Sequence, residues 1–350
     1  MKKISSEITL IILSRNRQHC LMKTLNYYSN QSLNILVIDN SKFPLNKKFI
    51  PSNCTYIHSK TNFAQRSQLA SKLIKTRYAI MGADDEIYLP SALFKMQRFL
   101  DNNLSYESVG GVAMAVWKYG PKTAASWAYK ETLALNNRLN TPLARIKFHT
   151  RNGIEPRTAF FTTNLTRSVS MKRCLNLYAN SPVVATDALS LFSICGAGKS
   201  IYLKEVYWIR NWNQSPKSNS NWNRNISLGD WWLDKQNRKE RLKFMSKLRS
   251  VYAEFFGKNY FEETWNLILL SSLSTKISGS KLRSYFTIFT EYDFVKNVVY
   301  LLKKILFPLK IPDLTEDILL EFKKNSIKFN ISELLPSIKI VKDLRPYRNW

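Results

Sequence analysis

Residues 78–86 read YAIMGADDE, a short apolar run that ends in three consecutive acids. Its Tyr, Ile and Met side chains favour a covered strand, and Asp84, Asp85 and Glu86 then follow the strand's carboxyl end. In an open α/β sheet, ligands bind at that edge. Carboxylates that converge there need a cation, a proton or a basic partner to offset their repulsion. The alternative is an acidic turn that only caps the next helix.

The composition indicates a globular protein with an anionic partner. The chain has 350 residues, 45% of them hydrophobic, which is enough for one large core or two modest ones. Its formal net charge is +28. Such a charge suits nucleic acid, an anionic membrane face or a phosphorylated substrate. The basic residues are spread along the chain, so the charge by itself does not choose among these partners.

The cysteines and the apolar runs exclude several classes of protein. Cys20, Cys54, Cys174 and Cys195 form no CxxC pair and have no metal-like spacing with the three histidines. This pattern disfavours a zinc site and a disulfide scaffold. There is no signal-peptide pattern and no uninterrupted apolar stretch of about 18 residues. We therefore expect a cytoplasmic protein, with peripheral contact at the inner face of the cell membrane as a further option.

Strand and helix patterns alternate in the first hundred residues. Apolar runs predict strands at 8–13, 34–38, 55–58 and 78–81. Helical spacing predicts helices at 18–28, 62–76 and 90–102. This βαβ series predicts a mostly parallel sheet with helices on both faces. A GxGxxG fingerprint and a GxxxxGK[ST] loop are both missing from the sequence, which disfavours a classical dinucleotide fold and a P-loop phosphotransferase.

The pattern of predicted strands and helices changes in the second half of the chain. We expect a central strand at 109–116, an irregular insertion at 117–156 and another strand at 159–163. Helices at 165–178 and 184–195 and a strand at 200–209 follow. Helical patterns dominate from residue 230, so we place a domain boundary in the polar stretch near 217–229, with domains at 1–220 and 221–350. The apolar, lysine-containing segment 295–307 suits a core helix better than an interfacial membrane helix.

The order of these features resembles the GT-A glycosyltransferases of family 2 type. Among them, the chain is similar to the bacterial glycosyltransferase-domain proteins of surface-polysaccharide clusters. The matching segments are Ile8–Asn16, Leu36–Ser41, Asn62–Arg66 and Met81–Glu86. The resemblance implies a GT-A fold, which is a Rossmann-like, mostly parallel sheet flanked by helices, here with a mainly α-helical C-terminal extension. It covers residues 7–115 well, covers 155–215 loosely and leaves the last 120 or so residues unmatched.

The resemblance also implies roles for a donor site. Ser14 and Arg15 would lie near the nucleotide of a nucleotide-diphosphate sugar, and Asp39 would face its base. Arg66 would line the base or phosphate pocket. Arg210 would contact the diphosphate or the acceptor.

The remaining implied roles concern catalysis. Asp84 and Asp85 would form a DXD-like site for Mg²⁺ or Mn²⁺, and Asp187 would be the catalytic base. A divalent cation offsets the charge of a diphosphate leaving group, and a separate carboxylate takes the acceptor proton. This division predicts a single displacement with inversion. The chain departs from the family pattern because Gly82, Thr186 and Ala64 stand where an acid, an acid and a glycine are usual.

The activity expected from this resemblance is an inverting, metal-dependent transfer of a sugar to a growing surface glycan or a lipid-linked acceptor. Two alternatives remain open. A basic nucleic-acid-binding protein fits the charge and the aromatic content, but no recognition motif is evident. A nucleotidyltransferase also pairs carboxylates with metal, but it would need a Gly-rich phosphate loop after the first strand, and residues 14–17 read SRNR.

Overall fold

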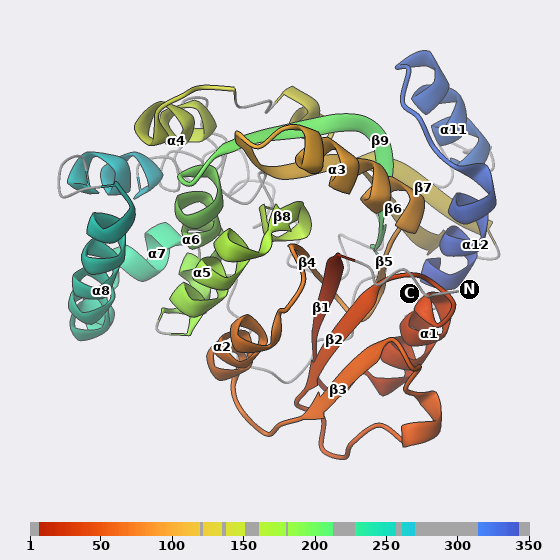
Figure 1. Ribbon diagram of the computed structural model, residues 1–350, viewed down its shortest axis with the longest axis horizontal. Coiled ribbons are helices and arrows are strands. Elements are labelled where there is room, and N and C mark those ends of the chain that lie inside the picture. Colours follow the sequence, from red (N-terminus) through yellow and green to blue (C-terminus); the bar gives the residue numbers. More distant parts are fainter. Residues whose placement is uncertain are drawn as a thin grey trace, which may run out of the picture.

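The computed structural model has an α/β architecture with one central sheet (Figure 1). It describes residues 7–119, 122–134, 138–150, 161–179, 181–212, 228–256, 261–269 and 314–342. The nine strands follow the order β3-β2-β1-β4-β8-β6-β9-β5, and β7 pairs with β6 outside this path. The predicted α/β class, a sheet flanked by helices with a helical C-terminal part, is confirmed.

The first four strands form the parallel half of the sheet. They are β1 (Ile8–Ser14), β2 (Asn34–Asp39), β3 (Cys54–His58) and β4 (Tyr78–Gly82). β1 pairs in parallel with β2 and β4, and β2 pairs in parallel with β3. Each of these strands is therefore oriented with its carboxyl end toward the same edge.

The second half of the sheet is mixed. Its strands are β5 (Glu86–Tyr88), β6 (Tyr106–Tyr119), β7 (Lys122–Ala128), β8 (Leu165–Arg167) and β9 (Lys199–Asn211). β8 runs antiparallel between β4 and β6, so β6 and its parallel neighbour β9 point in the same direction as β4. β5 runs antiparallel to β9 and returns the chain from the acidic turn.

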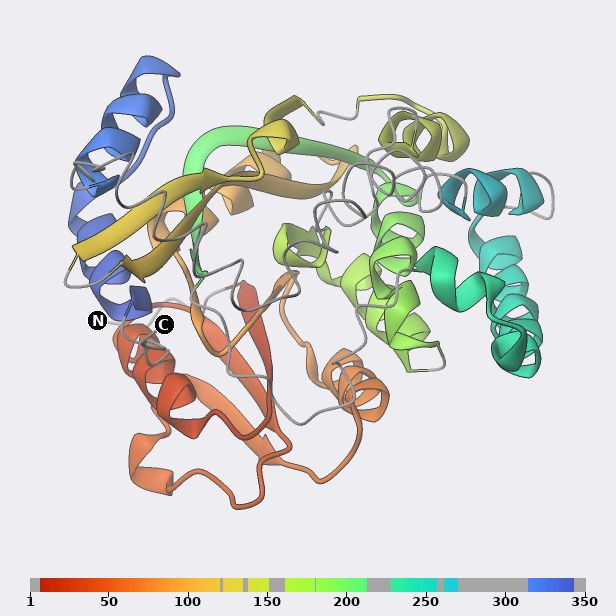
Figure 2. The ribbon, with the colours of Figure 1, turned by 180° about the vertical axis from the view of Figure 1, so that it is seen from behind.

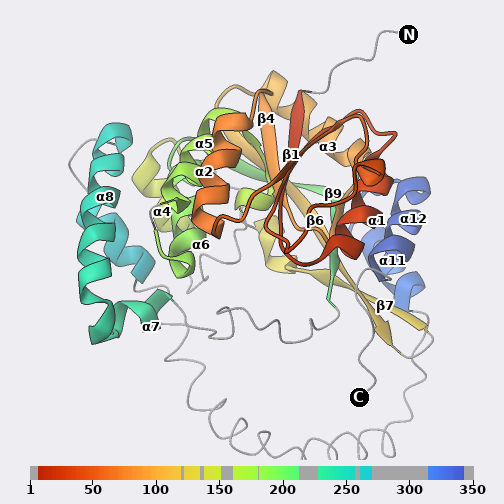
Figure 3. The same ribbon diagram turned by 90° about the horizontal axis from the view of Figure 1, so that it is seen from below.

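Helices cover both faces of the sheet, as Figure 3 shows from below. One face carries α1 (Gln18–Tyr28) and α3 (Pro90–Asn102). The other carries α2 (Phe63–Leu73), α4 (Pro142–Thr150), α5 (Ser168–Tyr178) and α6 (Thr186–Ser190), which continues as a π-helical segment at Leu191–Cys195. Alternation along β1 explains the two layers, because Leu10 and Ile12 join the first core and Ile11 joins the second.

The described C-terminal helices pack in two separate places. α7 (Leu228–Leu233), α8 (Arg238–Phe256) and a helix over 261–269 join the core beside α5 and α6. In contrast, α11 (Leu314–Lys324) and α12 (Ile331–Lys342) join the core under α1 and α3. Seen from behind in Figure 2, α11 lies beside β7, where Phe322 and Trp127 are in ring contact. The domain boundary near 217–229 stays a prediction.

Some sequence predictions differ from the structure in detail. The strand expected at 159–163 is wrong for its described part, because Phe161–Thr163 is a 3-10 turn and the strand is β8. The insertion expected at 117–156 contains β7 and α4. The segment 295–307 lies outside the described residues. Among the helices that are described, none is long and apolar enough to cross a membrane.

Candidate active site

The carboxyl ends of β1, β2 and β4 bring the candidate residues together. Ser14 ends β1 and pairs with Asp39 at the end of β2. Asp84 follows β4, and the Ser14 hydroxyl donates a hydrogen bond to its Oδ2 at 2.7 Å. Parallel strands ending at one edge thus place Ser14, Asp39 and Asp84 in one neighbourhood, as the sequence predicted.

The acid pair Asp84–Asp85 is buried and paired with a cation from the chain. Asp84 is 3% exposed and Asp85 is 1% exposed. The Arg17 guanidinium contacts both carboxylates, with Nη1 at 3.0 Å from Asp84 Oδ1 and Nη2 against Asp85 Oδ2. Burial lowers the pKa of Arg17, but the charges of Asp84 and Asp85 raise it, and the net shift is upward. Arg17 therefore stays charged and offsets the repulsion between the two carboxylates.

Helix α1 holds the acidic turn in place. The Thr24 hydroxyl donates to the Asp84 carbonyl at 2.8 Å. At the far side of the turn, the Tyr88 amide donates to the Tyr28 hydroxyl at 2.7 Å, and that hydroxyl donates to the Tyr88 carbonyl at 3.2 Å. The turn is therefore fixed through its backbone, which leaves the orientation of the Asp84 and Asp85 side chains to their own partners.

Asp39 is fully buried and already has partners within the protein. Its Oδ1 accepts from the Ser41 amide at 2.9 Å and from the Ser41 hydroxyl, and its Oδ2 accepts from the Tyr56 hydroxyl at 2.8 Å. These contacts stabilise the turn after β2, so Asp39 has a structural role in addition to the predicted contact with a nucleotide base. That contact stays a prediction.

Arg66 and Arg15 add positive charge to the same edge. Arg66 is buried, and its Nη1 donates to the Ser14 carbonyl at 2.7 Å. Burial lowers the pKa of Arg66 and the nearby charge of Arg15 lowers it further, while Asp39 and Asp84 oppose this shift. Three charged groups thus act on Arg66, and of the two arginines Arg15 is exposed and Arg66 is buried.

Arg210 reaches the acidic turn from the other half of the sheet. β5 and β9 pair Glu86 with Arg210, and their side chains form an ion pair at 3.2 Å. The Arg210 guanidinium also lies over the rings of Tyr129 and Trp208, 5.5 Å from each centroid. Trp208 is itself buried and donates to Glu86, so it is not an open platform for a sugar. Arg210 is therefore beside the acidic turn, and its predicted contact with the diphosphate or the acceptor stays a prediction.

Asp187 lies on a different element. It is half-buried in the first turn of α6, where its carbonyl accepts from the Ser190 hydroxyl at 2.7 Å. Burial raises the pKa of Cys174 to about 11, and the charge of Asp187 contributes to that rise. The helices α5 and α6 share one core cluster, so Asp187 lies near α5. Its role as catalytic base stays a prediction.

The donor chemistry of the acid pair fits a hard divalent cation. Asp84 and Asp85 offer carboxylate oxygens, the ligands that Mg²⁺ and Mn²⁺ prefer. Within the described ranges, no group of three or more His, Cys, Asp or Glu side chains gathers where a metal ion could sit. The protein would thus supply two carboxylates, and a bound diphosphate and water would supply the remaining ligands. Arg17 occupies the same carboxylate oxygens in this structure.

Arg17 is the residue of this site that sequence reasoning missed. It directly precedes α1, at the position that caps the helix. A cation is unfavourable at a helix N-terminus because the helix dipole is positive there. An arginine at that position, with no acid in the first turn of α1, was a signal that a distant carboxylate compensates it.

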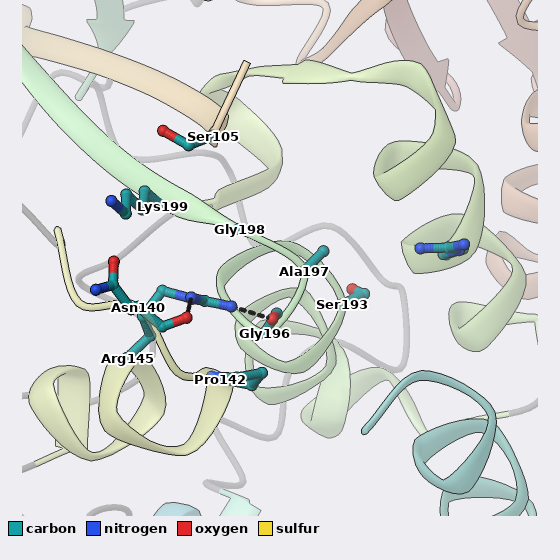
Figure 4. A pocket seen from close by; sticks show the side chains of 10 residues that line it. Ser105, Asn140, Pro142, Arg145, Ser193, Gly196, Ala197, Gly198 and Lys199 are labelled. Carbon is teal, nitrogen blue, oxygen red and sulfur yellow. Dashed lines mark hydrogen bonds between the residues drawn. The ribbon is translucent and has the colours of Figure 1, made fainter. Parts of the chain in front are cut away.

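A separate cavity of about 680 Å³ lies near the start of β6 and β9. Ser105 and Lys199 lie on its wall at the amino ends of these strands, and Arg210 lies near the carboxyl end of β9. In Figure 4, the guanidinium of Arg145 points at the backbone rather than into open space. It donates to four carbonyl oxygens, including those of Cys195 at 2.7 Å and Gly196 at 2.6 Å. Arg145 therefore has a structural role, and this cavity is separate from the acid pair.

Comparisons with known proteins find distant likenesses in fold. No family model matches the chain. No curated protein matches it either. A crystal structure of S. aureus TarS, residues 1–349, is 12% identical with a TM-score of 0.49, and the match covers 80% of this chain and 74% of that one. A longer TarS structure is 14% identical with a TM-score of 0.39, covering 80% and 54%. The bifunctional IspDF from Campylobacter jejuni is 14% identical with a TM-score of 0.30, covering 57% and 49%.

Proposed function

We propose that this chain is a glycosyltransferase. It moves a sugar from a nucleotide-diphosphate sugar to a hydroxyl group of a growing surface glycan or a lipid-linked acceptor, with inversion at the anomeric carbon. The observation that carries the proposal is the buried Asp84–Asp85 pair after β4, next to Ser14 and in electrostatic contact with Arg66. Buried carboxylates at the ligand edge of an α/β sheet are costly unless a cation offsets them.

Different residues of the chain bind the donor and transfer the proton in this reaction. Arg15 and Arg66 attract the diphosphate, and Arg210 contacts the diphosphate or the acceptor. Asp187 accepts the proton from the acceptor hydroxyl as that oxygen attacks the anomeric carbon. A Mg²⁺ or Mn²⁺ ion held by Asp84 and Asp85 supplies charge neutralisation of the leaving diphosphate. Because the base and the leaving-group site are separate, the displacement is single and inverts the configuration.

The net charge is compatible with the proposed partners. A net charge of +28 favours a phosphorylated donor and an anionic, lipid-linked acceptor. The same charge favours peripheral contact with an anionic membrane surface, and we place the protein at the cytoplasmic face.

The first test is calorimetric titration of UDP and GDP, with and without Mn²⁺. We expect one nucleotide to bind in a metal-dependent way. Asp84→Asn should weaken that binding by about tenfold or more, equivalent to about 1.4 kcal/mol, because it removes a charged ligand. Asp187→Asn is the matched control, since it removes a carboxylate that does not hold the diphosphate; its nucleotide binding should persist while sugar transfer is lost.

Failure of both UDP and GDP to bind would count against the proposal. If neither nucleotide bound with Mn²⁺ present, and the protein instead bound DNA or RNA with a steep salt dependence, the glycosyltransferase proposal would be overturned in favour of the nucleic-acid alternative.

A further inference from the structure

Arg17 bridges the two carboxylates that the proposed function assigns to a metal ion. Its Nη1 contacts Asp84 Oδ1 and its Nη2 contacts Asp85 Oδ2. A single planar guanidinium therefore spans both acids, in a forked geometry that suits two acceptor oxygens. The Arg17 side chain remains 30% exposed while the acids beneath it are almost fully buried. Arg17 thus covers the acid pair on a side that solvent can reach.

We propose that Arg17 is a built-in counter-cation, which holds the Asp84–Asp85 pair until a nucleoside diphosphate and a divalent cation displace it together. The inference rests on the proposed function, since it takes the displacing ligand to be the diphosphate of a donor. Arg17 and a metal ion compete for the same two carboxylates, so the ion alone binds weakly. When a diphosphate is present, Arg17 gains a new anionic partner as it leaves the acids.

The position of Arg17 makes this exchange feasible. It is the residue before α1, where the helix dipole disfavours a cation and favours a phosphate. Moving the guanidinium from the acids to a phosphate near the same helix end therefore keeps its charge compensated. The preceding residue, Asn16, has a φ of 55° in the left-handed region. Its amide donates to the Ser41 hydroxyl at 2.8 Å, which sets the direction in which Arg17 leaves the strand.

The same contacts connect Arg17 with the predicted nucleotide residues. Ser41, which accepts from Asn16, also donates to Asp39. A base that binds at Asp39 therefore acts on a residue in direct contact with the loop that carries Arg17. Linkage requires that a nucleotide which draws Arg17 away from the acids raises the affinity for the metal ion, and that the ion raises nucleotide affinity by the same factor.

The test measures Mn²⁺ binding from the loss of the free-ion EPR signal, first without nucleotide. We expect weak binding by the wild-type protein and binding about tenfold tighter by Arg17→Gln, because the competing cation is gone. Arg17→Lys should give an intermediate affinity, since lysine keeps the charge without the fork, and it serves as the second variant if Arg17→Gln is poorly folded. Lys23→Gln is the matched control, because Lys23 has the same charge, is exposed on α1 and has no assigned role in the site; its Mn²⁺ affinity should stay within about twofold of wild type.

A second series repeats the titration with UDP or GDP. The nucleotide should raise Mn²⁺ affinity strongly in wild type and much less in Arg17→Gln. Equal Mn²⁺ affinities in the wild-type protein and both Arg17 variants would overturn the inference, and so would a gain in Lys23→Gln equal to that in Arg17→Gln. If nucleotide raises Mn²⁺ affinity equally with and without Arg17, the inference fails and the proposed function survives. If Arg17→Gln binds Mn²⁺ more tightly but no nucleotide binds, the counter-cation role stands and the proposed donor site fails.

Discussion

At the scale of single residues, Asn16 determines how the first strand leads into its helix. Its φ of 55° is one that non-glycine residues seldom adopt, and asparagine tolerates it better than most. The Asn16 side chain adds a second restraint, because its Oδ1 accepts from the Lys42 amide at 3.1 Å. The conformation directs Arg17 toward the acids, so a local backbone choice positions a charge at the site.

We predict that Asn16→Ala is less stable than Asn16→Gly by about 1 kcal/mol, because alanine is strained in the left-handed region and glycine is not. Both variants lose the contact with Lys42. The difference between their free energies of unfolding therefore reports the backbone strain at residue 16 alone. Urea denaturation of the two proteins measures it. Equal free energies of unfolding would show that Asn16 leaves the left-handed conformation in solution.

Residue identity was enough to predict some site members but not their partners. Asp39, Asp84 and Asp85 stand out in the sequence as acids after apolar runs, and the structure places all three at one edge. The same reasoning predicts that Arg15 lies near the nucleotide, but it predicts no role for Arg17. No local rule says which of two neighbouring arginines turns inward, because that depends on the φ of Asn16 and on the acids across the sheet.

At the scale of elements, α1 works as a clamp on the acidic turn. It contributes Thr24 and Tyr28, one helical turn apart, to the two ends of that turn. Tyr28 is fully buried, and burial raises its pKa well above the ordinary value. Its hydroxyl is therefore a neutral group that both donates and accepts.

We predict that Tyr28→Phe destabilises the protein by about 1–3 kcal/mol, because the buried Tyr88 amide and carbonyl lose their partner. Tyr27→Phe is the control: its hydroxyl is only partly buried and accepts from Ser337, so the cost should be smaller. Thermal unfolding followed by circular dichroism compares the two. A Tyr28→Phe protein as stable as Tyr27→Phe would contradict the role of α1 as a clamp.

Long or well-capped elements were predictable, and short ones were not. The helix predicted at 62–76 is one such element, because Asn62 forms a reciprocal capping box with Gln65 at the start of α2. The helix predicted at 90–102 is another, since Pro90 lies in the first turn of α3, where its missing N–H costs nothing. The strand β5 has only three residues, Glu86–Tyr88, and exists because β9 pairs with it. A run that short has no periodicity of its own to detect.

At the scale of the whole molecule, the last described helices are joined to the core that begins with β1. Leu334 and Val341 of α12 are fully buried in the cluster that includes Ile8 and Leu10. Polar contacts reinforce this packing, since the Asn211 side chain at the end of β9 donates to the Val341 carbonyl at 2.6 Å. Unfolding of α12 should therefore be coupled to unfolding of the sheet.

We predict that Leu334→Ala lowers the free energy of unfolding by about 2–5 kcal/mol, because it opens a cavity in a shared core. The adjacent Leu335 is 47% exposed, so Leu335→Ala should change stability by only about 0.5 kcal/mol. Urea denaturation followed by tryptophan fluorescence measures both. A separate, shifted transition for part of the signal in Leu334→Ala would instead support an independent C-terminal unit.

The sequence by itself determined the alternation of strands and helices in β1 to β4 and the acids after the fourth strand. These features depend on periodicity, caps and strand ends, which are properties of neighbouring residues. Only the tertiary structure decided which charges meet. Ser14 and Asp84 are in contact although they lie 70 positions apart, and Arg17 turns inward to contact Asp84 and Asp85. The helix α12 returns from the far end of the chain to the first core. Contacts of this kind depend on how the elements pack, and no pattern within a single segment specifies them.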